Sequence, residues 1–153
     1  NADLPSFERD ITHLFNDPIV HYRGELNEVQ KHTFLGAARA LIFPIDWPEP
    51  FGLVMAEALA CGTPVIAFRR GSVPEVIEHG VTGFIVDTVD EAVDAVRRLP
   101  EIDRRACRAA FEARFTAPRM VADYLPIYDR LSKASRPPQP QPQPQPACAD
   151  LIS

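Results

Sequence analysis

The chain has 153 residues, of which 46% are hydrophobic and 24% are charged, and these values are typical of a globular protein with one core. They disfavour a fibrous or wholly disordered chain. A net charge of −5 disfavours binding to nucleic acid or anionic lipid through bulk electrostatics. No apolar run approaches the length of a membrane span, so we expect no integral membrane span and a cytoplasmic location.

The predicted elements alternate between helices, whose apolar residues recur three and four apart, and short apolar strands. In chain order they are a helix over residues 4–14, a strand over 19–22, a helix that begins at Asn27, a strand over 40–43, a helix over 52–60, a strand over 64–68, a short helix over 73–78, a strand over 83–86 and a helix that begins at Thr88. Asn27 with Gln30 and Thr88 with Glu91 have the spacing of capping boxes, and Ser72 can cap the short helix. This alternation predicts an α/β fold with a parallel sheet and helices on both faces.

The C-terminal part of the chain has no strand pattern. Residues 102–115 and 116–131 predict two consecutive helices, and Pro126 inside the second predicts a kink or a break. Alternating Pro and Gln residues follow, and this segment should be an extended, disordered tail that does not join the core. We therefore expect one domain over residues 1–135 and a low-complexity tail over residues 136–153.

Glu57 is the only charged residue in the apolar helix predicted over residues 52–60. An unpaired carboxylate in a buried helix would be costly, so we expect Glu57 to meet a cation, several hydrogen-bond donors or a polar ligand. Glu49 precedes it by eight residues, which is about 12 Å of rise in a helix, so the two carboxylates would contact different parts of one long ligand. The spacing alone equally allows Glu57 to pair with a buried arginine while Glu49 is a solvated loop residue.

Two turns offer backbone N–H groups to an anion. The start of the 52–60 helix would present the amides of Phe51, Gly52 and Leu53 together with the positive end of the helix dipole. Gly71 and Ser72 follow the next strand, at the edge of the sheet where open α/β sheets bind ligands, although they can also form a capped surface turn. An anion held between the two carboxylates suits a diphosphate that joins a sugar to a nucleoside.

These motifs, taken in their order, resemble the donor-binding half of the group 1 retaining glycosyltransferases, which have the GT-B fold. The resemblance runs from about residue 19 to about residue 131. It is carried by Glu-Pro-Phe-Gly-Leu at residues 49–53, by Glu-Ala-Leu-Ala-Cys-Gly-Thr-Pro-Val-Ile-Ala at 57–67, by Gly-Ser-Val-Pro-Glu-Val-Ile at 71–77 and by Gly-Val-Thr-Gly-Phe at 80–84.

The resemblance implies a Rossmann-like domain that binds a nucleoside-diphosphate sugar, from which a hexosyl group is transferred with retention of configuration. Glu49 would be catalytic and would contact the donor sugar, Glu57 would accept from the ribose hydroxyls, and residues 22–25 would lie beside the base. The family holds the leaving diphosphate with basic side chains and a helix N-terminus, so no metal and no cofactor are expected. The substrate-binding residues implied are Glu49, Pro50, Phe51, Gly52, Leu53, Glu57, Gly71 and Ser72.

The chain also departs from the family pattern. In the family an acceptor-binding domain and a further strand-helix unit with a phosphate-binding Arg and Lys come earlier, and Arg9, Arg23 and Lys31 do not match those two positions. We therefore expect a partial donor domain that is inactive alone, that lacks its N-terminal acceptor-binding partner, and that can self-associate through the exposed interface. Two other functions remain open, namely a non-catalytic interaction or regulatory module and a phosphorylase or epimerase of the same fold.

Overall fold

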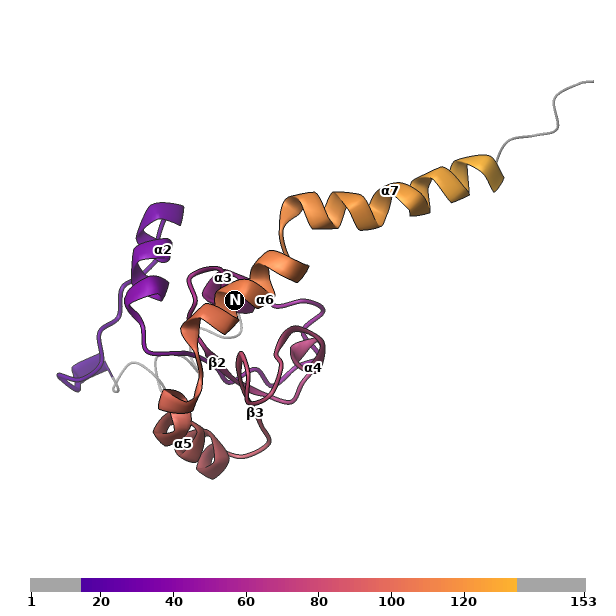
Figure 1. The fold of residues 1–153 in the computed structure, drawn as a ribbon. Helices are drawn as coiled ribbons and strands as arrows, with labels where there is room; N and C mark the ends of the chain where they lie inside the picture. Colours follow the sequence, from indigo (N-terminus) through magenta and orange to yellow (C-terminus); the bar gives the residue numbers. More distant parts are fainter. Residues whose placement is uncertain (1–14, 135–153) are drawn as a thin grey trace, which may run out of the picture. The chain divides into compact units, whose positions relative to one another are not determined.

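The computed structural model describes residues 15–134, which include a three-stranded parallel sheet (Figure 1). Ile66 in the middle strand lies opposite Ile42 on one side and Phe84 on the other. The strands, in their order across the sheet, are β1 (Leu41–Phe43), β2 (Val65–Phe68) and β3 (Gly83–Val86). The predicted α/β class is confirmed, and so are three of the four predicted strands.

Helices lie on both sides of this sheet, with α3 in contact with β1 and β2 and α5 in contact with β2 and β3. The helical elements are α2 (Glu28–Ala37), α3 (Leu53–Ala60), α4 (Val73–Val76), α5 (Val89–Arg98), the 3₁₀ turn η2 (Leu99–Glu101), α6 (Arg104–Arg114) and α7 (Ala117–Ala134). The capping box of α2 forms as predicted, because Asn27 Oδ1 accepts from the Gln30 N–H and Gln30 Oε1 accepts from the Asn27 N–H. Thr88 caps α5 by accepting the Glu91 N–H, but the Glu91 side chain accepts from the Asp87 N–H rather than from that of Thr88, so the predicted capping box forms only in part.

The core lies between β2, β3 and the helices that cover them. Val65, Ile66 and Phe84 are buried, because neighbouring strands and helices cover both faces of the central strand. The carboxyl ends of the three parallel strands meet at one edge of the sheet, and each is followed by a loop that leads into a helix. The predicted site residues 49–52 and 71–72 lie in the first two of these loops, and Leu53 begins α3, at the edge where open α/β sheets bind ligands.

The strand predicted over residues 19–22 is absent. The N–H groups of Ile19 and Val20 both bond to Asp17 in a turn, and Ile19 is 84% exposed. An apolar run becomes a buried strand only where a neighbouring strand supplies backbone partners, and no strand of the described chain lies beside this one. The helix predicted over residues 4–14 and the tail predicted over residues 136–153 lie outside the described residues.

The end of the described chain consists of two consecutive helices, α6 and α7, as predicted. The chain divides into two compact units, the first ending at Phe115 and the second beginning at Thr116. Pro126 lies inside α7, which continues through it, so of the predicted kink or break the break does not occur and the kink stays a prediction. The residues around Pro126 are exposed, and water can therefore bond to the carbonyl group that the proline leaves without an amide partner.

Candidate functional site

The loop after β1 and the turn after β2 are packed against each other through their backbones. The Ser72 N–H donates to the Glu49 carbonyl oxygen at 2.9 Å. A Cβ atom on Gly71 would lie only 2.3 Å from that same oxygen, and Gly71 has a positive φ of 47°, so glycine alone fits this position. The two predicted motifs are therefore one structural unit, which fixes Glu49 at the edge of the sheet.

The Glu49 side chain turns back onto the start of α3. Its Oε1 accepts the Gly52 N–H at 3.1 Å, and its Oε2 accepts the indole N–H of Trp47 at 3.1 Å. Gly52 is the N-cap of α3 in a left-handed conformation, and a Cβ there would lie 2.6 Å from the Met55 side chain. The Gly52 amide expected to bind an anion thus already binds the Glu49 carboxylate, which the positive end of the helix favours.

The other residues predicted around the start of α3 lie at the surface. Pro50, Phe51 and Leu53 are exposed, whereas Gly52 between them is buried. The ring of Phe51 contacts that of Phe115 edge to face, with centroids 6.1 Å apart. The start of α3 therefore presents accessible apolar side chains on either side of a buried glycine, whose missing Cβ leaves room for the Met55 side chain.

Ser72 is only 7% exposed, and its Oγ has no hydrogen-bond partner within the described residues. The prediction that this hydroxyl caps α4 is wrong. Ser72 has helical backbone angles, φ −74° and ψ −6°, whereas a capping residue usually has extended ones from which its side chain reaches the first turn. A buried hydroxyl without a partner costs about 1–3 kcal/mol, so this group is free to bond a ligand beside Glu49.

Glu57 meets a cation, as the sequence predicts, and the cation is Lys31 of α2. Lys31 Nζ lies 2.7 Å from Glu57 Oε1 and 3.0 Å from Glu28 Oε1, and hydrogen bonds to these two carboxylates raise the pKa of Lys31. The side chains of Lys31 and Glu57 are 27% and 36% exposed. The sequence did not single out Lys31 for this role, because the helices that carry the two residues meet only in the folded chain.

A cavity of about 260 Å³ opens beside this ion pair. Its walls combine the ion pair with mostly apolar side chains, and they are formed by Glu28, Lys31, His32, Leu35, Phe51, Leu53, Ala56, Glu57, Ala60, Cys61, Phe111 and Phe115. Glu49 is not among them. This cavity therefore borders one of the two predicted carboxylates, Glu57 of α3, and not Glu49 in the loop before α3.

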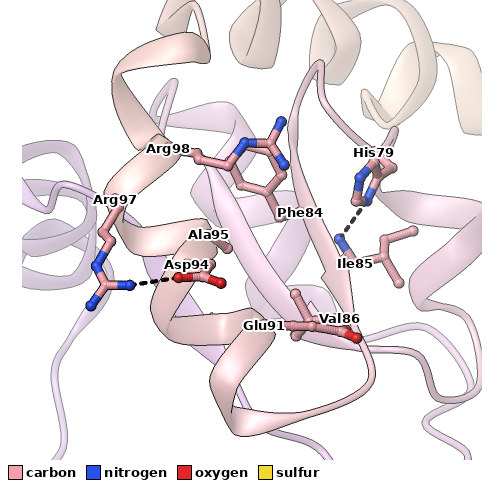
Figure 2. Close-up of a pocket in the computed structure, with 9 residues that line it drawn as sticks. All are labelled: His79, Phe84, Ile85, Val86, Glu91, Asp94, Ala95, Arg97 and Arg98. Carbon is pink, nitrogen blue, oxygen red and sulfur yellow. Dashed lines mark hydrogen bonds and ion pairs between the residues drawn. The ribbon is translucent and has the colours of Figure 1, made fainter.

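A second cavity, of about 460 Å³, lies beside β3 and α5 (Figure 2). In Figure 2 Arg97 is turned toward Asp94, and the two side chains are 2.6 Å apart. His79 Nδ1 accepts the backbone N–H of Ile85 at 3.1 Å. These polar groups serve the local structure, and none of the predicted site residues lines this cavity.

Residues 15–134 hold no group of three or more His, Cys, Asp or Glu side chains arranged for a metal ion. Cys61 and Cys107, the cysteines in this range, are free thiols. Within the same range, no helix has the length and apolar character needed to cross a membrane.

Comparison with known proteins adds a family to this geometry. The sequence model for glycosyl transferases group 1 matches residues 4–114, which is more than half of the chain and includes every predicted site residue. The chain belongs to the group 1 glycosyl transferases. The resemblance carried by the motifs at residues 49–84 is confirmed at the level of the family.

This group 1 glycosyl transferase chain has curated relatives that are much longer. The N-acetyl-alpha-D-glucosaminyl L-malate synthase of Bacillus anthracis is 39% identical over 97 residues, which are 58% of this chain and 25% of the relative. A D-inositol 3-phosphate glycosyltransferase of a Nocardioides species is 38% identical over 88 residues, which are 56% of this chain and 19% of the relative. An uncharacterized 41.2 kDa protein in the cps region of Klebsiella pneumoniae is 34% identical over 115 residues, which are 71% of this chain and 32% of that protein. The chain thus spans a third or less of each relative.

Proposed function

We propose that this chain is the donor-binding part of a retaining glycosyltransferase that transfers a hexosyl group from a nucleoside-diphosphate sugar to an acceptor. Family membership supports the transferase reaction. The observation that carries the donor site is the joined pair of loops at the edge of the sheet, where the Ser72 N–H binds the Glu49 carbonyl, the Ser72 hydroxyl is without a partner among the described residues, and the Glu49 carboxylate caps the start of α3.

The diphosphate would lie at the start of α3. Its negative charge would be favoured by the positive end of the helix dipole. The Ser72 hydroxyl would donate to a phosphate oxygen, and the Glu49 carboxylate would leave the Gly52 N–H and bind hydroxyl groups of the sugar. The helix dipole and the Ser72 hydroxyl would stabilise the charge that develops on the leaving diphosphate, so the proposed reaction needs no metal or cofactor.

The nucleoside would lie farther along α3. Lys31 donates to Oε1 of Glu57, and Oε2 would accept from the ribose hydroxyls. Phe51 and Leu53 line the cavity beside this ion pair and provide apolar surface between the phosphate end and the ribose end. We place residues 22–25, Tyr22 among them, beside the base.

We propose that retention arises from a front-face step, in which the acceptor hydroxyl attacks the anomeric carbon from the side that the diphosphate leaves. The acceptor must be held about 3–3.5 Å from that carbon with water excluded, which takes a second wall that faces the start of α3. We propose that an acceptor-binding domain supplies this wall, and that the chain alone binds a nucleoside diphosphate weakly and transfers no sugar. Turnover of a radiolabelled nucleotide sugar by the 153-residue chain would contradict this part of the proposal.

The donor site can be tested by titrating UDP and GDP into the chain and following saturable shifts of its NMR signals. Replacing Glu57 with Gln should weaken binding about tenfold to a hundredfold, the effect of losing one charge-assisted hydrogen bond, while the unfolding midpoint changes little. Glu112→Gln is the matched control, because Glu112 is also a helical carboxylate paired with a cation, Arg108 of α6. Equal affinity in the wild type and in Glu57→Gln would reject the proposal.

Ser72 gives a second test of the same site. Replacing Ser72 with Ala removes a buried hydroxyl that lacks a partner in the described chain, so the free energy of unfolding should stay constant or rise. Binding of the nucleoside diphosphate should nevertheless weaken. A variant that binds normally would show that this hydroxyl takes no part in the site, and a loss of stability would show that it serves the fold.

A further inference from the structure

The helix that supplies Lys31, α2, has little apolar contact with the rest of the fold. Leu35 is its only buried residue, and Val29 and Phe34 on the same helix are exposed. Burial of one leucine contributes only about 1.5–3 kcal/mol, which is small beside the cost of fixing a ten-residue helix. The position of α2 therefore depends strongly on its polar contacts.

Arg104, the first residue of α6, supplies several of these contacts. Its guanidinium group donates to the carbonyl oxygens of Ala38 at 2.6 Å and Gly36 at 2.9 Å, and to Thr63 Oγ1 at 2.9 Å. The Thr63 hydroxyl, which is fully buried, in turn donates to the carbonyl oxygen of Leu35 at 2.7 Å. Carbonyl groups at the end of a helix lack partners within it, and a cation there also complements the helix dipole.

The base of Arg104 is itself fixed by close packing. Gly62, in the turn between α3 and β2, has a positive φ of 66°, and a Cβ there would lie 2.9 Å from the Arg104 carbonyl oxygen. The start of α6 thus packs directly against the backbone of that turn. The guanidinium group therefore extends from a rigid base and joins three elements, namely α6, the turn and the end of α2.

We propose that Arg104 is a positioning residue for the donor site, because it fastens α2 to the core and thereby keeps Lys31 on the Glu57 carboxylate. Arg104 does not line the cavity beside this ion pair, so its effect on a ligand passes through α2 and Lys31. The assignment of a ligand to Glu57 rests on the proposed function. The mechanical link from Arg104 through α2 to Lys31 does not depend on the proposed function.

The mechanical link can be tested by amide hydrogen exchange of the whole chain. In Arg104→Ala the amides of α2 should exchange at least about tenfold faster, while those of β2 and β3 remain unchanged. Arg105→Ala, which removes the neighbouring and exposed arginine, is the matched control and should leave α2 unchanged. The pKa of Lys31, measured by NMR, should fall toward its ordinary value in Arg104→Ala only, because the carboxylates that raise it lie farther away. Unchanged exchange in α2 and an unchanged Lys31 pKa would overturn the proposal.

Binding of UDP or GDP tests the second step. Arg104→Ala should weaken binding as much as Lys31→Met does, and the double variant should be no weaker than either single variant, because both act through one contact. Additive losses would overturn this step. If Arg104→Ala does not fold, Arg104→Lys and Thr63→Val remove parts of the same network with less disturbance. If the wild-type chain binds neither nucleotide, the proposed function fails, whereas hydrogen exchange and the Lys31 pKa still decide the role of Arg104.

Discussion

Helices α3 and α7 are both rich in apolar residues, but they differ in what those residues contact. Met55, Ala58 and Leu59 of α3 are completely buried, whereas every residue of α7 from 117 to 133 is exposed. The apolar residues of α3 surround the whole helix, and those of α7 form one stripe opposite ion pairs. Because apolar side chains stabilise a fold only when they leave water, α3 contributes to the core and α7 depends mainly on its own backbone hydrogen bonds.

The largest effect on the free energy of unfolding should come from adding a side chain in the packed region, at Gly83 of β3. A Cβ atom there would lie 1.9 Å from the carbonyl oxygen of Val65, which is backbone and cannot rotate away. Gly83→Ala should therefore cost more than about 3 kcal/mol in the free energy of unfolding or prevent folding. The control is Gly36→Ala in α2, where no atom lies within 4 Å of the added Cβ and the change should be neutral or stabilising. Equal stability of the two variants, measured in denaturant, would show that β2 and β3 are not packed as described.

The comparison between the two helices is tested directly by Met55→Ala in α3 and Leu125→Ala in α7. Met55 is 0% exposed, so its truncation should leave a cavity and cost about 2–5 kcal/mol. Leu125 is 60% exposed, and its truncation should change the free energy of unfolding by less than about 0.5 kcal/mol. Denaturant unfolding followed by circular dichroism measures both. A large loss in Leu125→Ala would mean that the stripe of α7 is covered in solution.

The pH dependence of stability tests burial at a further position of the packed region, the thiol of Cys107 in α6. Burial raises the pKa of Cys107 from 9.0 to about 11, so the folded chain holds this proton more tightly than the unfolded chain does. The contribution of the protonated thiol to the free energy of unfolding is fully present below pH 9. It falls by about 2 kcal/mol as the pH rises from about 9 to about 11. Cys107→Ala should lack this part of the decline. Parallel curves for the two proteins over that range would show that the thiol is exposed to solvent.

The smallest effect should come from an ion pair on the surface of α7. Arg119 and Asp123 lie four residues apart, with Nε and Oδ2 separated by 2.9 Å, and both side chains are exposed. Asp123→Asn should weaken α7 by about 0.3–0.5 kcal/mol, and the difference should disappear in 1 M salt because exposed ion pairs are screened. Hydrogen exchange of the α7 amides at low and high salt measures this change. A difference that persists at high salt would point to a hydrogen-bonding rather than a charge effect.

The sequence is most informative where structure depends on neighbouring residues. The capping residues Asn27 and Thr88 and the glycine at position 52 placed three helix starts correctly, because caps act over a few residues. The strand predicted over residues 19–22 failed because a strand needs a partner that its own residues do not encode. The hydroxyl of Ser72 failed as a cap because packing against the Glu49 loop, and not local preference, sets its backbone angles.

The candidate site also combines features that neighbouring residues determine with features that depend on contacts between distant parts of the chain. The order of the motifs was sufficient to find the Glu49 loop, the Gly71 turn and the need for a partner at Glu57. It was not sufficient to find Lys31 and Arg104, which lie in ordinary helical patterns and act across contacts between α2, α3 and α6. Asp103 caps the start of α6 in the structure, but such a local contact does not indicate that the next side chain reaches the end of α2.

The backbone contact between Glu49 and the Gly71-Ser72 turn also limits which loops of this chain can be exchanged with those of a relative. The carbonyl oxygen of Glu49 is bonded by Ser72 and leaves no room for a side chain at position 71, so neither loop can change its length without moving the other. A chimera that takes only one of the two loops from a relative would misplace the carboxylate against the edge of the sheet. Residues 44–52 and 69–72 should therefore be exchanged together when this chain is recombined with a relative.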